Sequence, residues 1–127
     1  MLDARPIDGG IGAASALKVA YASWTKIGAA MQLAIRGLAE AEGVGDALVD
    51  EWAISQAGLA ERTERAAAGV GPKAWRFIGE MEQIAASFDG AGLPSGFADA
   101  AAEIYERLAD LKGTDAPTLG EVLDRLN

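Results

Sequence analysis

Apolar residues follow a helical rhythm along most of the chain, and the longest such run lies near the N-terminus. Residues 12–42 are dominated by alanine and larger apolar residues, and a glycine follows at position 43. A helix of this length that is apolar on nearly every face is usually central to a bundle. We therefore predict one long helix over residues 12–42 that ends at Gly43, with the remaining elements packed around it.

Five shorter helical patterns follow, each bounded by glycine, proline or a capping residue. They cover residues 46–56, 59–68, 72–90, 95–112 and 119–126. Asp46, Ser95 and Thr118 stand where N-caps are expected. Strand-like alternation is absent and β-branched residues are sparse. The predicted fold class is all-α: a bundle of about five to six helices built around the long N-terminal helix, as one domain of residues 12–127 after a lead-in loop of residues 1–11.

Two of these helices carry clear apolar stripes that we expect to form the core. The stripe of the 72–90 helix is Phe77, Met81, Ile84 and Phe88, and the stripe of the 95–112 helix is Phe97, Ala101, Ile104, Leu108 and Leu111, with Tyr105 beside it. A charged run at 61–65 is typical of a solvated helix face, where single ion pairs contribute little stability.

Composition excludes several functions. The chain of 127 residues has a net charge of −8, which disfavours nucleic acid or an anionic membrane as a partner. It contains no cysteine and no histidine, so thiol chemistry, a Ser-His-Asp triad and histidine-based metal sites are excluded. No apolar run is long enough to span a membrane and no signal peptide is visible, so we expect a cytoplasmic protein that binds no membrane.

One line of polar residues runs along the long apolar helix. At about 100° per residue, Thr25, Gln32 and Arg36 fall within about 40° of the direction of Lys18, and Ser15 and Tyr21 flank that line. We call these residues the polar stripe: Ser15, Lys18, Tyr21, Thr25, Gln32 and Arg36. A charged amine in an apolar helix either extends along the helix surface to water or faces a cleft that holds a ligand, and periodicity alone leaves both interpretations open.

The glycines before Lys18 carry a resemblance to a known family. The spacing Gly9-x-x-Gly12-x-Ala14-x-x-x-Lys18 resembles the G-x-x-G-x-G-x-x-x-K motif of the β-hydroxyacid dehydrogenase superfamily, which includes 6-phosphogluconate dehydrogenase. The segments GAASALKVAYASWTK and EMEQIAASFDGAGLP are more similar to a bacterial branch of 6-phosphogluconate dehydrogenase-like proteins that end in a C-terminal domain of unassigned function. The resemblance covers roughly residues 9 to 112.

The sequence departs from the superfamily pattern at several positions. Ala14 replaces the third glycine, Ala22 stands where many relatives carry asparagine, and Thr25 stands where 6-phosphogluconate dehydrogenase has a catalytic glutamate. A lysine-aspartate pair of the superfamily corresponds here to Gly79 and Glu80, so it is not carried over. Only Gly9, Gly12 and Lys18 match residue by residue, and the departures argue against 6-phosphogluconate itself as substrate.

The resemblance implies a division of labour between two domains. A dinucleotide-binding domain, absent from this sequence, would hold NAD or NADP, while the helical domain would supply Lys18 as catalytic acid/base, part of the pocket for a small hydroxyacid-type substrate and the contacts of a homodimer. Tyr21, Thr25 and Gln32 are the candidate substrate contacts. The isolated chain would then be inactive and would bind no cofactor or metal of its own.

Two other functions are weighed against this one. The first is a stand-alone helical dimerisation or interaction module without catalysis. The second is a metal-dependent hydrolase, which needs inward carboxylates paired with histidines at helical spacing and is disfavoured because the chain has no histidine. The apolar excess of the long helix predicts a homodimer, whether the chain is a dehydrogenase domain or a stand-alone module.

Overall fold

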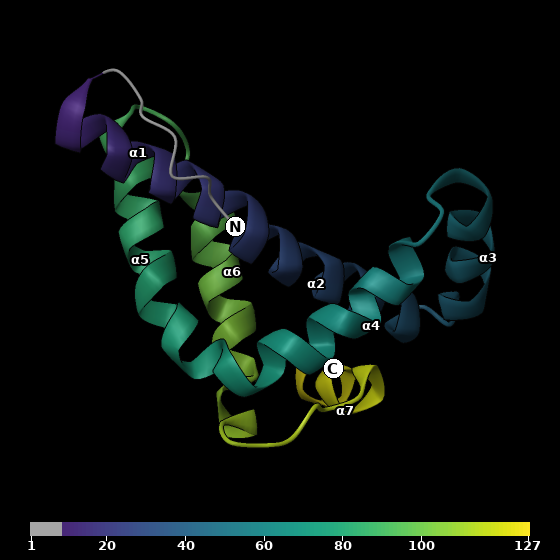
Figure 1. The fold of residues 1–127 in the computed structure, drawn as a ribbon. Helices are drawn as coiled ribbons and strands as arrows, with labels where there is room; N and C mark the ends of the chain where they lie inside the picture. Colours follow the sequence, from purple (N-terminus) through teal and green to yellow (C-terminus); the bar gives the residue numbers. More distant parts are fainter. Residues whose placement is uncertain (1–8) are drawn as a thin grey trace.

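The computed structural model describes residues 9–127, and this part of the chain is built from helices without any strand (Figure 1). The α-helices are α1 (Gly10–Ala22), α2 (Gly28–Ala41), α3 (Gly45–Ser55), α4 (Leu59–Val70), α5 (Ala74–Gly90), α6 (Gly96–Arg107) and α7 (Leu119–Leu126). A π-helical segment, Ser23–Ile27, joins α1 to α2, and 3₁₀ turns occupy Gly71–Lys73 and Ala109–Leu111. The predicted all-α class is confirmed.

Helices α1 and α2 with the π segment between them form one rod, which corresponds to the predicted long helix. The rod ends as predicted: Gly43 takes a positive φ of 71°, and the N–H of Val44 donates to the carbonyl of Ala39 at 2.9 Å. These two features define a Schellman C-cap. Counted as one element, the rod brings the number of helices in the described residues to six. Residues 1–8 of the predicted lead-in lie outside the described residues, and the helix begins at Gly10.

The π segment was not predicted from the sequence, although its residues suggest a local cause. The Ser23 hydroxyl donates to the carbonyl of Val19 at 2.8 Å, and the Thr25 hydroxyl donates to the carbonyl of Ala22 at 3.2 Å. Side-chain hydroxyls that bond to preceding carbonyls compete with the helical ladder and often accompany bends or irregular turns. Two such hydroxyls within three residues mark the place where the rod widens.

The core lies where α5 and α6 pack against each other beneath the rod (Figure 1). Phe77, Met81 and Ile84 of α5 are buried as predicted. The stripe predicted for α6 is partly wrong: Phe97 is 58% exposed, whereas Tyr105, placed beside the stripe, is fully buried. Ala101, Leu108 and Leu111 of the stripe are buried as predicted, and Ala98, which the stripe did not include, is buried as well.

Helix α3 extends away from the rest of the bundle, at the end of the rod that is opposite to α1 (Figure 1). It buries none of its residues. The predicted N-cap, Asp46, is wrong: the capping position is Val44, and no side chain caps the helix. Asp46 instead occupies the first turn, where a carboxylate still interacts favourably with the helix dipole.

The C-terminal helix α7 packs onto the underside of the rod. Thr118 caps it as predicted, in a capping box with Glu121. The close approach is at Gly37, where an added Cβ would lie 3.7 Å from Leu126 Cδ1, and the amide of Asn127 donates to the Gly37 carbonyl at 3.2 Å. Within residues 9–127, no helix combines the length and apolar character that crossing a bilayer requires.

Candidate functional site

The N-terminal half of the polar stripe lies on the open face of α1. Lys18 is exposed and makes no hydrogen bond or ion pair with another described residue. Tyr21, one turn further on, is about one-third exposed. None of the hollows described below is lined by either residue. Among the described residues, Lys18 therefore presents a solvent-accessible amine on a helix surface.

A sharp backbone turn precedes Lys18 by two helical turns. Gly9 is the residue before α1 and has a left-handed φ of 104°, which non-glycine residues rarely adopt. A Cβ at this position would lie only 2.8 Å from the Cβ of Ala13. The first glycine of the motif is thus required by the entry into α1, independently of any ligand.

The C-terminal half of the polar stripe takes a different direction. Thr25 and Gln32 line a hollow of about 470 Å³ between the rod and α4, which we call the α2–α4 hollow. Arg36 does not continue towards this hollow; its guanidinium donates to the Thr63 hydroxyl at 2.8 Å. Thr63 is fully buried and donates to the carbonyl of Ala60, so Arg36 ties α2 to α4 as a structural residue.

The π segment explains why the polar stripe divides. The predicted alignment assumed about 100° of rotation per residue along the whole rod. A π turn closes its hydrogen bonds over five residues rather than four, so residues beyond it fall behind the helical phase of those before it. Lys18 and Tyr21 therefore share one surface, and Thr25 and Gln32 share another. The structure does not bring the four predicted site residues into one pocket.

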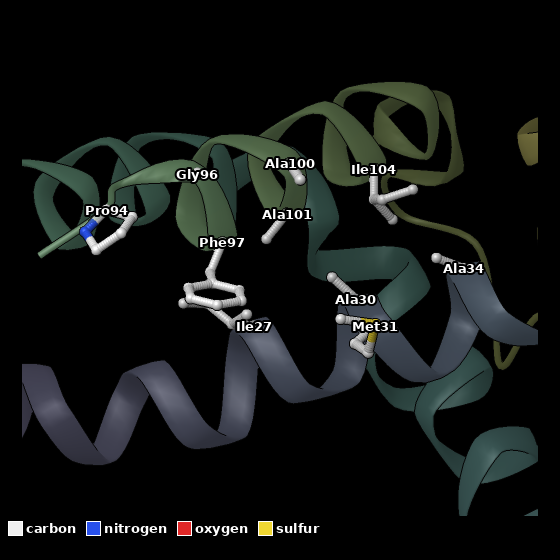
Figure 2. Close-up of a pocket in the computed structure, with 10 residues that line it drawn as sticks. All are labelled: Ile27, Ala30, Met31, Ala34, Pro94, Gly96, Phe97, Ala100, Ala101 and Ile104. Atoms are coloured by element: carbon white, nitrogen blue, oxygen red, sulfur yellow. The ribbon is translucent and has the colours of Figure 1, made fainter. Parts of the chain in front are cut away.

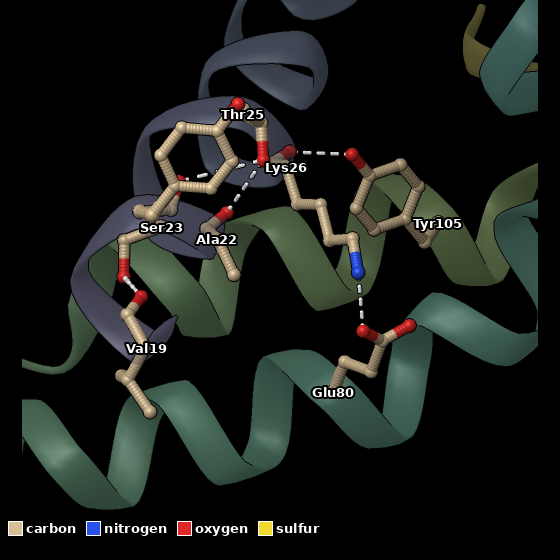
Figure 3. Close-up of polar contacts among 8 residues, drawn as sticks. Val19, Ala22, Ser23, Thr25, Lys26, Glu80 and Tyr105 are labelled. Atoms are coloured by element: carbon tan, nitrogen blue, oxygen red, sulfur yellow. Dashed lines mark hydrogen bonds and ion pairs between the residues drawn. The ribbon is translucent and has the colours of Figure 1, made fainter. Parts of the chain in front are cut away.

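Residues from three elements meet beneath the π segment, in an arrangement that sequence reasoning missed. Lys26 forms an ion pair with Glu80 of α5, and the hydroxyl of Tyr105 on α6 donates to the backbone carbonyl of Lys26 (Figure 3). The Lys26 amine also lies 4.7 Å from the centre of the Phe77 ring. These partners are 54 and 79 residues away along the chain, so no local spacing in the sequence indicates them.

Tyr105 is the described residue with the most perturbed ionisation. Burial raises the pKa of its phenol well above the usual 10, and the nearby negative charge of Glu80 raises it further. Its ring packs edge-on against Phe77 with centroids 5.5 Å apart. Because the Tyr105 phenol stays protonated and donates to the Lys26 carbonyl, we interpret Tyr105 as a residue that holds the π segment in place rather than as an acid or base.

Two further hollows are almost entirely apolar. The α2–α6 groove, of about 260 Å³, is lined by Ile27, Ala30, Met31, Ala34, Pro94, Gly96, Phe97, Ala100, Ala101 and Ile104. Figure 2 shows Phe97 of α6 reaching towards Ile27 on the rod. A second hollow, of about 480 Å³, lies between α1 and α5 and includes Val19 and Phe88 in its lining, together with Ser15 of the polar stripe. Apolar surface of this kind is typical of interfaces and of binding grooves.

Comparison with known proteins identifies one family. No curated protein and no solved structure matches this chain. The model of a family described as "Domain of unknown function (DUF1932)" matches residues 39–108, from the end of α2 to the end of α6. The match covers more than half of the chain and includes the α5–α6 pair that forms most of the core. The chain therefore belongs to this family, Domain of unknown function (DUF1932).

Proposed function

We propose that this chain is the C-terminal helical domain of an NAD(P)-dependent β-hydroxyacid dehydrogenase-like oxidoreductase. The family that matches it is the C-terminal domain associated with 6-phosphogluconate dehydrogenase-like proteins. The all-helical fold agrees with the helical domain that the resemblance implies. The segment that carries the lysine motif precedes the family match, so Lys18 is an additional argument rather than a repetition of the first.

The observation that carries the proposal is the state of Lys18. Its amine lies on α1 two turns after the obligatory glycine turn at Gly9, and it makes no ion pair with a described residue. Exposed lysines without a partner are common on protein surfaces, so this state is necessary for the proposed role without being special to it: an amine that transfers protons must be free to meet the substrate. In the proposed enzyme, Lys18 exchanges a proton with the substrate hydroxyl, and Tyr21 lies one turn away to contact the same substrate.

The nicotinamide cofactor would be held by another part of the enzyme. Residues 9–127 are helical and contain no strand–turn–helix unit of the kind that binds dinucleotides. Bound NAD or NADP supplies the hydride chemistry, and this chain supplies the proton at Lys18 Nζ and the wall of the substrate pocket. Because the Lys18 side chain is exposed, the proposed site needs a second surface that excludes water from the amine.

The decisive experiment replaces Lys18 in the protein that contains both this chain and its dinucleotide-binding domain. Removing a general acid/base lowers the rate by about 10²–10⁴-fold, so Lys18→Met should reduce turnover to that extent. Lys73→Met is the matched control, because Lys73 is also exposed and unpaired among the described residues but lies on the turn before α5. A normal rate in the Lys18→Met enzyme would refute the catalytic role.

The second experiment uses this chain alone. We expect no turnover of hydroxyacids and no saturable binding of NADH or NADPH in a calorimetric titration, because residues 9–127 contain no strand–turn–helix unit of the kind that binds dinucleotides. Clear cofactor binding by the isolated chain would contradict the division of labour. Full-length protein, titrated in parallel, shows that the cofactor preparation is competent.

The alternative is a stand-alone helical dimerisation module that has lost catalysis. The observation that favours it is the apolar α2–α6 groove, where Met31 and Phe97 are at least half exposed. Both hypotheses include a homodimer, which we propose buries part of the rod. Sedimentation equilibrium at micromolar concentration tests the proposed dimer. We expect the wild-type chain to be a dimer and Phe97→Glu or Leu17→Glu to make it monomeric. A monomeric wild-type chain would contradict the proposal. The coding sequence upstream of this chain distinguishes the two hypotheses. An in-frame segment that encodes a strand, a glycine-rich turn and a helix favours the enzyme, and its absence favours the module.

A further inference from the structure

The α2–α4 hollow has the features of a binding site for a small organic anion. It is lined by Trp24, Thr25, Gly28, Ala29 and Gln32 of the rod and by Arg62, Arg65, Ala66 and Val70 of α4. Its volume of about 470 Å³ lies within the range of small-molecule pockets. Lys18 is not part of it, so this site can be tested separately from the proposed dehydrogenase chemistry.

Two arginines give the α4 side of the hollow positive charge. Arg62 and Arg65 are three residues apart on α4 and therefore share one helix face. Neither guanidinium group makes an ion pair or a hydrogen bond with another described residue, although the chain carries 19 carboxylate side chains. Adjacent Glu61 contributes to the lining of a different hollow, between α3 and α4. Two unpaired planar guanidinium groups on one wall are suited to bidentate recognition of a carboxylate.

The remaining walls are apolar and roomy. Trp24 is 80% exposed, which is unusual for an indole ring that has no ligand or partner against it. At Gly28, an added Cβ would meet nothing within 4 Å, so the floor of the hollow is open. A flat ring can therefore lie against Trp24 with van der Waals contact to the small residues Ala29 and Ala66.

The rod side of the hollow carries an unused acceptor. Gln32 Oε1 is buried and has no hydrogen-bond partner in the structure. A buried, unsatisfied acceptor costs about 1–3 kcal/mol, so a ligand that donates a hydrogen bond to it recovers that free energy. Thr25 already uses its hydroxyl proton on the Ala22 carbonyl, and its oxygen can only accept. The lining thus combines two cationic side chains from α4 with acceptors from the rod.

We propose that the α2–α4 hollow binds an aromatic hydroxy-carboxylate. The carboxylate is held by Arg62 and Arg65, the ring lies on Trp24, and the phenolic hydroxyl donates to Gln32 Oε1. This arrangement uses the two unpaired guanidinium groups and the unpaired buried acceptor of the hollow.

The test is a titration of this chain with 4-hydroxybenzoate, followed by ¹H–¹⁵N spectra that report the Trp24 indole and the arginine Nε groups. We expect saturable shifts of both, and binding at least about tenfold weaker for the neutral 4-hydroxybenzamide, a loss of about 1.4 kcal/mol or more. If the shifts do not saturate up to about 10 mM 4-hydroxybenzoate, the proposal is wrong, because weaker binding is not distinguishable from non-specific association. Inorganic phosphate that binds as tightly as the aromatic acid would also overturn it, because the ring would then contribute nothing.

Matched variants separate the site from general electrostatics. The double variant Arg62→Gln/Arg65→Gln should weaken 4-hydroxybenzoate binding by at least about tenfold. Lys73→Gln/Arg76→Gln removes the same charge at the same spacing near the start of α5 and should leave affinity within about twofold. Equal weakening by both pairs would show non-specific attraction and contradict the site. Gln32→Leu should weaken 4-hydroxybenzoate but not benzoate, which lacks the hydroxyl; equal effects on both would exclude the proposed hydrogen bond.

Discussion

The two α-helices of the rod, α1 and α2, have similarly apolar compositions but very different surroundings. Helix α1 is alanine-rich and apolar, yet none of its described side chains is buried. Helix α2 is no more apolar, yet it buries Ala30, Leu33, Gly37 and Ala39. Apolar composition therefore predicts that both segments are helical but does not distinguish the half that contributes to the core from the half whose described side chains stay at least partly exposed.

The junction between the halves is where this difference arises. The Lys26 carbonyl accepts a hydrogen bond from Tyr105, and the Lys26 amine pairs with Glu80, so α5 and α6 both hold the π segment. Beyond this point, α2 runs along the core with α4 and α7 against it. Before it, α1 contacts the bundle on one face only, through partly buried Val19 and Ala22. The π segment thus separates α2, which packs on the core, from α1, whose described side chains are not buried.

The largest expected effect comes from truncating the same residue type in each half. Leu33 is fully buried in α2 and Leu17 is 41% exposed in α1. Leu33→Ala should lower the free energy of unfolding by about 2–5 kcal/mol, because it leaves a cavity in the core. Leu17→Ala should change it by no more than about 0.5 kcal/mol in the monomer. Chemical denaturation measures both.

Concentration dependence sharpens this pair. If α1 is covered in a dimer, Leu17→Ala should destabilise the dimer at high protein concentration and have little effect at low concentration, whereas the effect of Leu33→Ala should be similar at both. Equal losses for the two variants in the dilute monomer would break the comparison, because α1 would then be as well packed as α2.

The next effect is expected at the joint itself. Tyr105→Phe removes the hydroxyl that bonds to the Lys26 carbonyl and leaves a part-buried acceptor without its partner. We expect a loss of about 1–3 kcal/mol in unfolding free energy. Hydrogen exchange of the amides in residues 23–27 should accelerate more than that of the rest of α2. Unchanged exchange in the π segment would show that Tyr105 does not hold the joint.

The same residue predicts the response to alkaline pH. Burial and Glu80 raise the pKa of Tyr105 in the folded state above the unfolded value of about 10. The folded state therefore retains the phenolic proton when the unfolded state has released it. The contribution of Tyr105 to the free energy of unfolding is therefore constant below pH 10. Above pH 10 it declines by up to about 1.4 kcal/mol per pH unit. Denaturation between pH 9 and 11 should show this slope in the wild type and a smaller one in Tyr105→Phe.

The sequence predicts the ends of several elements correctly because those ends depend on single residues. Gly43 ends the rod through its positive φ, and Thr118 begins α7 through its capping box. Asp46 fails as a cap because the capping position of α3 is Val44, two residues earlier than expected. Burial is harder to predict from one stripe: Phe97 and Tyr105 exchange their expected places because small alanines, rather than the largest rings, decide the α5–α6 approach.

The candidate site is predicted less completely than the fold. Uniform helical rotation places Lys18, Thr25, Gln32 and Arg36 on one line, and a single π segment separates them. The contacts that fasten this segment come from α5 and α6, and the arginines that face Gln32 come from α4. These are tertiary relationships without a local sequence pattern. By contrast, the entry to α1 depends on local backbone geometry at Gly9, although the helix begins at Gly10, two residues before the predicted start.

The smallest effect concerns the second motif glycine, and it separates folding from function. Gly12 lies within α1 with ordinary helical geometry, and a Cβ added there would meet nothing within 4 Å. Gly12→Ala should therefore stabilise the isolated chain by about 0.5–1 kcal/mol, since alanine is the better helix former. If the open face of α1 approaches a substrate or a second domain closely, the same change should reduce activity of the two-domain protein. Melting temperature of the chain and turnover of the whole protein, measured together, check this: a gain in both would mean that the glycine serves no close approach and that this face of α1 is open for another reason.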